Sequence, residues 1–344
     1  MGAKFHIINI YPMFHKYFIA IPAYNEEKHI EEGLISINEA RKEALPDFSL
    51  ENTFICLNGC TDNTEKIVKN VILKMPELKI KILSSEKGMN RALNKIIDNI
   101  NKEFPIIKVD ADAICSKKSF YILLHELKKF PQLQIVGGYP RALPYIGKHW
   151  KNPYKTALSR ILDIRSNWPE SQIAVNDVRL FHKIADISSQ PEVTPIFEKK
   201  SRIYFHGRFY IMRDKKVWDV PPESIGDDTY LTISTYQRFG LNSIRIRYDA
   251  FCYYQPTTSF IAHWKTYKRI HHDLKTIFDI TVFKNMQYLK SFEKMKLNWP
   301  YINTLSTKIK VYFLCYSIIK LLENFLFQLF PKYSDKLWTY KKKN

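Results

Sequence analysis

Cysteine and other marks of secretion are sparse in this sequence. Five cysteines are scattered over 344 residues, and Cys56 and Cys60 stand too far from other thiols or histidines to make a zinc site. No disulfide framework is implied, which fits a reducing compartment. The N-terminal apolar stretch is interrupted by His6, Asn9 and His15, so it does not have the pattern of a signal peptide. We therefore expect a cytoplasmic protein.

A long uninterrupted hydrophobic run is also lacking. The one candidate, residues 311–330, is rich in Leu, Ile and Phe but carries Lys320 and Glu323 near its centre. Each such charge costs about 2.5–3.5 kcal/mol in the middle of a membrane-spanning helix. We therefore expect no spanning helix here and predict an amphipathic helix, which lies on a membrane surface or packs on the rest of the protein.

Acidic residues are outnumbered, and the imbalance is uneven. Lys and Arg total 53 against 34 Asp and Glu, a net charge of +19. From residue 255 to residue 344 there are 16 basic and 5 acidic residues, so +11 lies in the last quarter of the chain. None of the basic residues belongs to a recognisable nucleic-acid module, and we expect no nucleic-acid partner. Anionic lipid headgroups or a phosphorylated substrate fit this surface.

The most informative segment is a short apolar run, residues 104–109, that ends in two carboxylates, Asp110 and Asp112. Such a run predicts a buried strand of a parallel sheet, and Asp is a poor strand former, so the pair is expected where the strand ends. In open α/β sheets ligands bind at the carboxyl ends of the strands. With the period of two of extended chain, both carboxylates would point the same way and hold a divalent cation, with diphosphate oxygens as its other ligands. For the tripeptide alone, a solvated turn is the alternative.

Strand and helix patterns alternate over the first 150 residues and predict a parallel sheet with helices on both faces. The expected strands are residues 17–22, 53–57, 79–83, 104–109 and 133–136, and the expected helices lie between them and over residues 117–130. Further along, we predict a broken helix at 148–184, a loop at 188–201, and strands at 204–212, 243–248 and 251–254. A helix is predicted to begin after Gly226 and to end at Gly240, and the chain reads as helical from residue 258 onward.

Five motifs in order resemble glycosyltransferase family 2, which has the GT-A fold. They are FIAIPAYNEE at 18–27, NGCTDNT at 58–64, KGMNRALN at 87–94, DAD at 110–112 and GDDTYL at 226–231. The resemblance covers about residues 16–270. It implies a Rossmann-like, mostly parallel sheet with flanking helices in a catalytic domain at 1–270, with a nucleotide-sugar half at about 16–140 and an acceptor half at about 141–270. A helical, aromatic and basic extension would follow at 271–344.

The resemblance also implies roles on the donor side. Base and ribose would be held by Pro22, Ala23, Tyr24, Glu26 and by Asn58, which stands where many members carry Asp. Phosphates would be held by Lys87, Gly88 and Arg91. Asp112 would be the direct ligand of Mg²⁺ or Mn²⁺, and Asp110, with Ala111 beside it, would contact the ribose or the metal and its water. Two alternatives remain open: Glu26 only caps a helix, and Arg91 is an ordinary solvated helix residue.

On the acceptor side the resemblance makes Asp228 the catalytic base, with Asp227 beside it. Sugar transfer with inversion needs a carboxylate that takes the proton of the acceptor hydroxyl. The alternative is that the pair only stabilises a helix start, where carboxylates are favourable. The Gln-x-x-Arg-Trp signature of many family members is missing from residues 263–273. A processive polysaccharide synthase is therefore disfavoured.

Three classes of function remain at this point. The first is an inverting, metal-dependent transfer of one sugar from a nucleotide-diphospho-sugar to a lipid-linked, saccharide or protein acceptor. The second is a nucleotidyltransferase, which would need a Gly-rich, basic phosphate loop that residues 22–25 do not supply. The third is a non-catalytic basic module for membrane surfaces, which would not need carboxylates in two places. The sequence names neither the sugar nor the base nor the acceptor.

Overall fold

The structure is a computed structural model. It describes residues 14–142, 205–222, 226–240, 242–254, 259–279 and 307–330, with positions 157, 158, 161, 162, 224, 257 and 303. The chain forms two compact units, each described by itself. Unit 1 comprises Met1–Tyr139, Phe205–Pro222 and Leu231–Phe251, and unit 2 comprises Pro140–Tyr204, Glu223–Tyr230 and Cys252–Asn344. The loop predicted at 188–201 lies outside the described residues, as does nearly all of the broken helix at 148–184. The division into domains at 1–270 and 271–344 stays a prediction.

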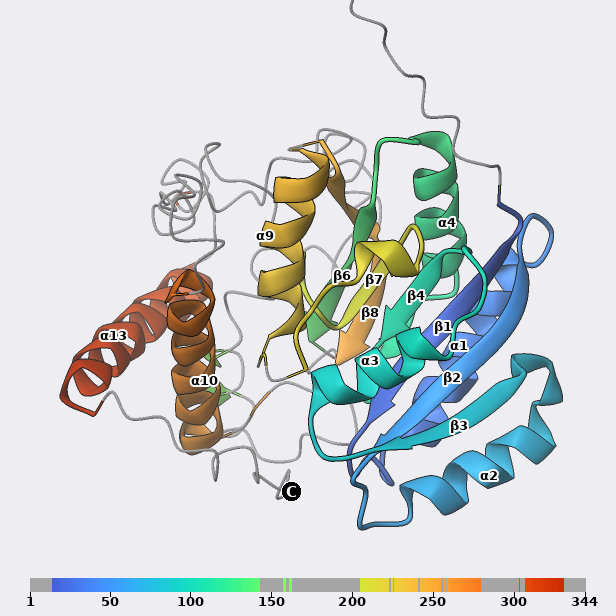
Figure 1. The fold of residues 1–344 in the computed structure, drawn as a ribbon. Helices are drawn as coiled ribbons and strands as arrows, with labels where there is room; N and C mark the ends of the chain where they lie inside the picture. Colours follow the sequence, from blue (N-terminus) through green and yellow to red (C-terminus); the bar gives the residue numbers. More distant parts are fainter. Residues whose placement is uncertain are drawn as a thin grey trace, which may run out of the picture. The chain divides into compact units, whose positions relative to one another are not determined.

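The first half of the unit 1 sheet is parallel and is built from strand–helix repeats, as predicted. Its strands are β1 (Lys16–Ala23), β2 (Ser49–Asn58), β3 (Ile80–Ser85) and β4 (Ile106–Val109), which lie side by side in the order β3-β2-β1-β4 (Figure 1). Side chains on both faces of β1 and β4 are buried, which accounts for their continuous apolar sequences.

The second half of the sheet reverses direction. Strand β7 (Phe209–Met212) pairs antiparallel with β4, and β6 (Ile135–Ala142) pairs antiparallel with β7. Next come β8 (Ile244–Tyr254) and the short β5 (Ile114–Cys115), which the sequence did not predict. The strands predicted separately at 243–248 and 251–254 are one strand, because no residue between them breaks the extended chain. The predicted α/β sheet with flanking helices is confirmed. Strands β1 to β4 pair in parallel, whereas β7 pairs antiparallel with β4 and with β6.

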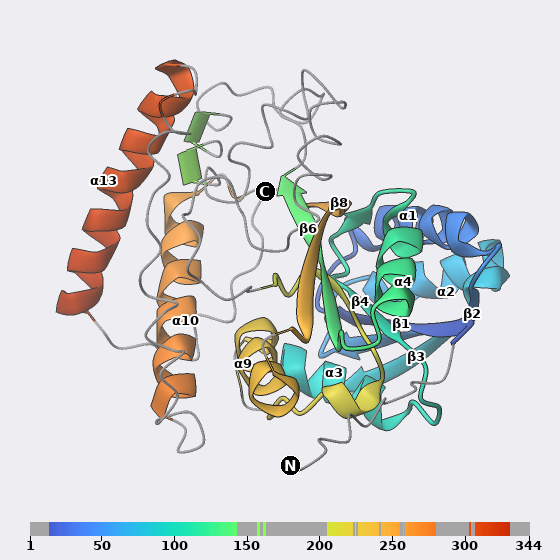
Figure 2. The same ribbon diagram turned by 90° about the horizontal axis from the view of Figure 1, so that it is seen from above.

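Helices cover both faces of this sheet (Figure 2). On one face α1 (Ile30–Ala44) packs against α2 (Thr64–Lys74) and α4 (Ser119–Lys129), while α3 (Met89–Asp98) lies on the other face against β1, β2 and β3. The buried side of α1 carries Ile30, Leu34, Ile37, Ala40 and Ala44, the spacing of one helical face. Full burial of one such Leu or Ile contributes about 1.5–3 kcal/mol. Unit 1 also contains two single-turn 3₁₀ helices, η1 (Pro76–Leu78) and η2 (Lys215–Val217).

The strand pairing brings several loops to one edge of the sheet. Ala23 pairs with Leu57 at the carboxyl ends of β1 and β2, and Asn58 pairs with Ser85 at the ends of β2 and β3. Strand β4 ends at Val109, opposite Phe209. The segments that follow β1, β2, β3 and β4 are therefore neighbours, and they contain the donor-side motifs.

In unit 2, α10 (Phe260–Asp279) and α13 (Thr307–Leu329) pack against each other (Figure 1). Glu323 of α13 is fully buried and accepts hydrogen bonds from His263 at 2.7 Å and from Lys320 at 2.8 Å. Burial alone would raise the pKa of Glu323, but these two partners outweigh it, and the pKa is lowered. The predicted amphipathic helix at 311–330 corresponds to α13. Within the described ranges, no helix is both long and apolar enough to cross a membrane.

Candidate active site

The loop after β1, residues 24–27, is locked against the loop after β2, residues 59–64. Asn25 adopts a left-handed backbone with φ of 52°, and its Oδ1 accepts a hydrogen bond from the Thr61 amide at 2.8 Å. Its Nδ2 donates to Thr61 Oγ1 at 3.3 Å. Glu27 reaches the other end of the second loop through two hydrogen bonds that Asn63 donates to its Oε2 at 3.1 and 2.9 Å. The two motifs thus form one rigid surface, a coupling that the sequence did not reveal.

These contacts also engage backbone groups of residues that are predicted to bind the nucleotide-sugar. The Cys60 thiol donates to the carbonyl of Ala23 at 3.2 Å, and burial raises the pKa of this thiol, so it remains a donor at neutral pH. The Glu26 amide donates to Thr64 Oγ1 at 2.8 Å, while the Glu26 carbonyl accepts from the amide of Ile30, the first residue of α1, at 2.9 Å. The backbone of Glu26 therefore belongs to the turn that leads into α1, whose N-cap residue is His29. A capping role of the Glu26 side chain stays a prediction. Its contact with a ribose stays a prediction.

A second set of contacts joins the ends of β2 and β3. Asn58 is buried, and its Oδ1 accepts a hydrogen bond from the Gly88 amide at 2.5 Å. The side-chain Nδ2 of Asn58 is therefore the group that would contact a base. Gly88 has φ of 149°, a conformation that side chains rarely allow, and it begins α3. Lys87 places its ammonium 4.7 Å from the centre of the Tyr24 ring. The predicted residues Tyr24, Asn58, Lys87 and Gly88 are thus brought together, while Pro22 is buried beneath them at the end of β1.

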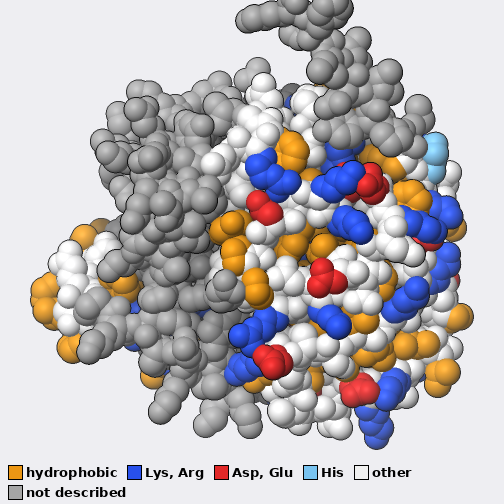
Figure 3. All heavy atoms as spheres, viewed as in Figure 1, with side chains coloured by type: hydrophobic (Ala, Val, Ile, Leu, Met, Phe, Trp, Pro, Cys, Tyr) orange, Lys and Arg blue, Asp and Glu red, His pale blue; other side chains and the backbone are white. Residues whose placement is uncertain are grey.

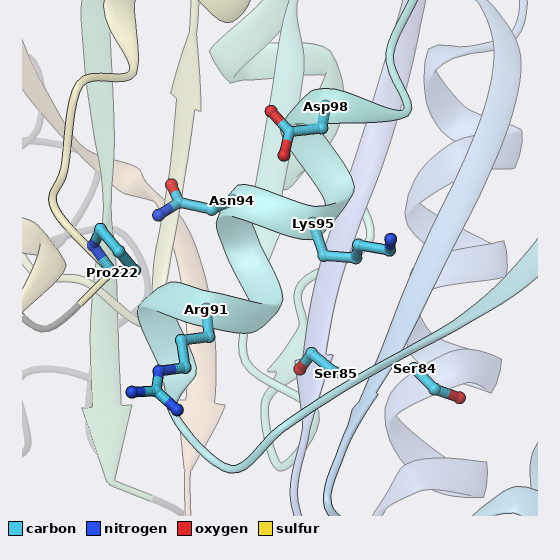
Figure 4. A pocket seen from close by; sticks show the side chains of 7 residues that line it. All are labelled: Ser84, Ser85, Arg91, Asn94, Lys95, Asp98 and Pro222. Atoms are coloured by element: carbon cyan, nitrogen blue, oxygen red, sulfur yellow. The ribbon is translucent and has the colours of Figure 1, made fainter.

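Arg91 lies one turn into α3 and pairs with Glu86 at 2.6 Å; the two side chains are 47% and 85% exposed. An ion pair this exposed contributes little to stability, so the guanidinium can exchange Glu86 for a phosphate at small cost. Arg91 also lines an open hollow of about 600 Å³ between α3 and the end of β3 (Figure 4). The hollow is lined by Ser84, Ser85, Arg91, Asn94, Lys95, Asp98 and Pro222. Its basic and hydroxyl groups suit an anion, and neither Asp110 nor Asp112 belongs to its lining.

The two carboxylates after β4 lie in a tight turn, which corrects the expectation of an extended segment. The Ala113 amide donates to the Asp110 carbonyl at 3.0 Å and closes the turn. The carboxylates nevertheless converge, because both approach the guanidinium of Arg208. Its Nη1 lies 3.2 Å from Asp112 Oδ1 and 3.8 Å from Asp110 Oδ2. Ala111, between the two acids, is buried.

Helix α1 packs closely against this acidic turn. A methyl group on Gly33 would lie 3.1 Å from the carbonyl oxygen of Ala111 and 3.2 Å from that of Ala113, so only glycine allows this approach without a shift. One turn further on, the Ser36 hydroxyl accepts from the Cys115 amide at 2.9 Å. The turn is therefore a fixed part of the sheet edge.

A buried lysine adds a cation to the acidic turn. Lys108 is 1% exposed, and its ammonium donates to Asp110 Oδ1 at 2.5 Å and to the carbonyl of Gly207. Sequence reasoning missed Lys108 as a functional neighbour, although it lies in the buried strand β4 only two residues before Asp110. Arg208 was missed as well, and no local signal marks it, because it lies 96 residues from Asp112 in sequence.

The carboxylate oxygens of Asp110 and Asp112 suit Mg²⁺ or Mn²⁺, which bind through one or two carboxylates together with phosphate oxygens. In the part of the chain that the structure describes, no group of three or more His, Cys, Asp and Glu side chains could hold a metal ion by itself. The donor atoms of Asp110 and Asp112 therefore fit a cation that arrives with a phosphate ligand.

Asp227 and Asp228 are the first residues of α9 (Asp227–Phe239), and they belong to unit 2. Asp227 is buried, with 2% exposure, whereas Asp228 is half-buried. The Oδ1 of Asp228 accepts from the Thr229 amide at 2.8 Å. Both carboxylates lie in the first turn of the helix. This position fits the alternative that the pair only stabilises the helix start, where carboxylates are favourable. The helix ends where Gly240 adopts φ of 83°, as predicted.

Comparison with known proteins gives one family match. Residues 18–187 match the model of glycosyl transferase family 2, and none of the curated proteins matches the chain. Mannosyltransferase PcManGT from Pyrobaculum calidifontis, solved with GDP-Man and Mn²⁺, superposes with a TM-score of 0.55 and 14% identity, covering 93% of this chain and 88% of that one. Glucosyl-3-phosphoglycerate synthase from Mycobacterium tuberculosis, in complex with Mn²⁺, UDP-Glc and phosphoglyceric acid, gives 0.47 and 15% over 77% and 79%. S. aureus TarS 1–349 with UDP gives 0.46 and 14% over 80% and 68%. Of these, the mannosyltransferase is similar enough to indicate a shared fold.

Proposed function

We propose that this chain, whose residues 18–187 belong to glycosyl transferase family 2 and whose fold is GT-A, moves a single sugar from a nucleotide-diphospho-sugar to an acceptor with inversion. The observation that supports the proposal most is the sheet edge of unit 1. There the interlocked loops, the Lys87–Tyr24 contact and the acidic turn follow neighbouring strands β1 to β4. Bases, phosphates and a cation can each find a suitable partner at this edge.

Each donor-site residue has a role in this proposal. The aromatic face of Tyr24 and the amide of Asn58 hold the base, and Glu26 reaches the ribose. Lys87 and Arg91 bind phosphate oxygens through charge-assisted hydrogen bonds, beside the first amides of α3, where anions are favoured. A cation held by Asp112 and Asp110 would stabilise the negative charge of the departing diphosphate.

The carboxylate of Asp228 accepts the proton of the acceptor hydroxyl as that oxygen attacks the sugar from the face opposite the leaving group. Asp228 is half-buried and has its Oδ1 on the Thr229 amide, a contact that fixes the orientation of the carboxylate. Asp227, fully buried at the helix start, orients the turn.

A donor screen tests this proposal. We expect at least one nucleotide-sugar, with UDP- and GDP-sugars tried first, to raise the melting temperature with Mn²⁺ or Mg²⁺ and to release its nucleoside diphosphate slowly. At 100 times the dissociation constant, a ligand adds about 2.7 kcal/mol of stability, which is several degrees for a chain of this size. Chelation of the cation by EDTA should remove most of the shift.

The same screen separates the competing classes. Turnover of a nucleoside triphosphate with a sugar phosphate would identify a nucleotidyltransferase instead. Neither a thermal shift nor turnover with any nucleotide would leave a non-catalytic binding module.

We further propose that the enzyme works at an anionic membrane surface on its cytoplasmic side, where a lipid-linked acceptor would be available. All five cysteines are free thiols, in keeping with a reducing compartment. One side of α13 is apolar and exposed (Figure 3). Seven of its residues, most of them spaced by three or four, are 50–68% accessible, and we call this set the α13 stripe. The stripe consists of Val311, Leu314, Ile318, Leu321, Leu322, Phe325 and Leu329. The opposite side, with Tyr316 and Glu323, packs toward α10.

Flotation with vesicles tests the membrane proposal. The intact chain should float with phosphatidylserine vesicles at low salt and much less at high salt, since each Lys or Arg near the surface contributes about 1 kcal/mol. Leu321→Glu in the stripe should abolish flotation. Leu73→Glu on α2, a site that is 81% exposed, is the matched control and should float like the parent. If the parent fails to float at low salt, the stripe is a contact within the protein or between copies.

A further inference from the structure

Arg208 lies at the acidic turn, and the proposed function gives it no part. It directly precedes β7, and its carbonyl accepts from the Asp110 amide at 2.9 Å, so the antiparallel pairing of β4 and β7 fixes it opposite the acids. Its Nη1 lies 3.2 Å from Oδ1 and 3.4 Å from Oδ2 of Asp112. The guanidinium therefore holds the carboxylate through both oxygens.

Among the residues that the structure describes, charges of both signs meet at this turn. Two carboxylates, Asp110 and Asp112, face two cations, Lys108 and Arg208. The cations differ in their freedom. Lys108 is 1% exposed and is enclosed by Asp110 and the Gly207 carbonyl, whereas the side chain of Arg208 is 26% exposed. Only Arg208 has a path to solvent.

We propose that Arg208 is an internal counter-cation, which holds the acidic turn until the donor arrives and then contacts the donor's diphosphate. The inference rests on the proposed function, because it assigns Arg208 to the same donor. A divalent cation that enters alone would place two more positive charges beside Lys108 and Arg208, and their repulsion opposes its binding. A diphosphate brings negative charge that offsets the added cation, and its oxygens can accept two hydrogen bonds from the planar guanidinium.

Two consequences follow for binding. The free protein takes up a divalent cation weakly, and the cation and the nucleotide strengthen each other. By linkage the factor is the same in both directions. Neutralising Arg208 should therefore have opposite effects on the two ligands: tighter binding of the cation alone and weaker binding of the nucleotide.

The test measures Mn²⁺ by electron paramagnetic resonance, which reports free ion and needs no turnover. Without nucleotide, Arg208→Gln should bind Mn²⁺ about tenfold more tightly than the parent, and with saturating Mn²⁺ it should bind UDP or GDP about tenfold more weakly, the size of one charge-assisted hydrogen bond. Arg208→Lys keeps the positive charge but loses the paired N–H donors of the guanidinium. It should bind free Mn²⁺ like the parent and the nucleotide with intermediate affinity.

Lys216→Gln is the matched control for loss of one positive charge. Lys216 is 63% exposed, pairs with Glu103 on the surface, and should change neither affinity. Equal Mn²⁺ affinities of the parent and Arg208→Gln, with only a lower melting temperature, would make Arg208 a structural residue and overturn the proposal. If Arg208→Gln does not fold, parent-like nucleotide affinity in Arg208→Lys would likewise overturn it. A parent that binds no UDP or GDP with or without Mn²⁺ would contradict the proposed function itself.

Discussion

Replacing Asp228 by asparagine is expected to lower the rate of sugar transfer by about 10²–10⁴, the usual contribution of a positioned proton acceptor. The amide keeps the shape of the side chain and can still accept from the Thr229 amide, so the start of α9 should stay intact. An amide oxygen is nevertheless too weak a base to take the acceptor's proton. Donor affinity should barely change, because the residue acts on the acceptor. Steady-state kinetics together with calorimetry of donor binding measure both quantities.

Asp227→Asn is the comparison for this variant. Asp227 is 2% exposed, so its replacement should affect stability more and the chemical step less. A large loss of kcat at 228 with the fold and donor binding intact would identify the base. Equal losses of activity at both positions, together with lower melting temperatures, would show that the pair only stabilises the helix start.

Asp112→Asn is expected to abolish the part of donor affinity that depends on Mg²⁺ or Mn²⁺, because an amide is a poorer ligand for a hard cation than a carboxylate. The fold should survive, since the amide oxygen can still accept from Arg208 Nη1. Titration calorimetry with a UDP- or GDP-sugar, with the cation and with EDTA, measures the change. Glu43→Gln, at an exposed acid near the carboxyl end of α1, is the control and should behave like the parent.

Unchanged donor affinity of Asp112→Asn in the presence of the cation would remove Asp112 from the donor site. Asp110 is a poorer probe of the same question, because it is the partner of the buried Lys108 ammonium. Removing one member of a buried ion pair costs about 3–5 kcal/mol, so loss of activity at position 110 would report stability and binding together.

The parallel half of the fold could be predicted because its information is local. The apolar runs of β1 and β4 and the buried face of α1 each show the period of one element, and Gly240 marks the end of α9. The loops that follow such strands must then lie at one edge. The positions of Tyr24, Asn58 and Lys87 could therefore be predicted from their places after β1, β2 and β3.

The antiparallel half could not be predicted in the same way, because its pairings join segments far apart in sequence. Nothing near Phe209 indicates that β7 pairs with β4, and without that pairing Arg208 cannot be connected to Asp112. The sequence also does not reveal the acidic turn, because the period of two holds only for extended chain and the Asp110 carbonyl closes a turn with Ala113. The conclusion that both carboxylates converge was correct for a different reason.

The pairing of β4 with β7 also bears on how the protein folds. The contacts of β1, β2, β3 and β4 with one another involve nearby repeats and can form early, whereas Arg208 reaches Asp112 only after a connection of 96 residues has closed. Closing a connection of that length costs entropy before the new contacts repay it, so such pairings form late. Until then Lys108 lacks the Gly207 carbonyl, and the edge of β4 is unpaired on the side that β7 later covers. The pairing that completes the surroundings of the acidic turn thus forms late, and in a nascent chain Arg208 can reach Asp112 only once β7 has been synthesised.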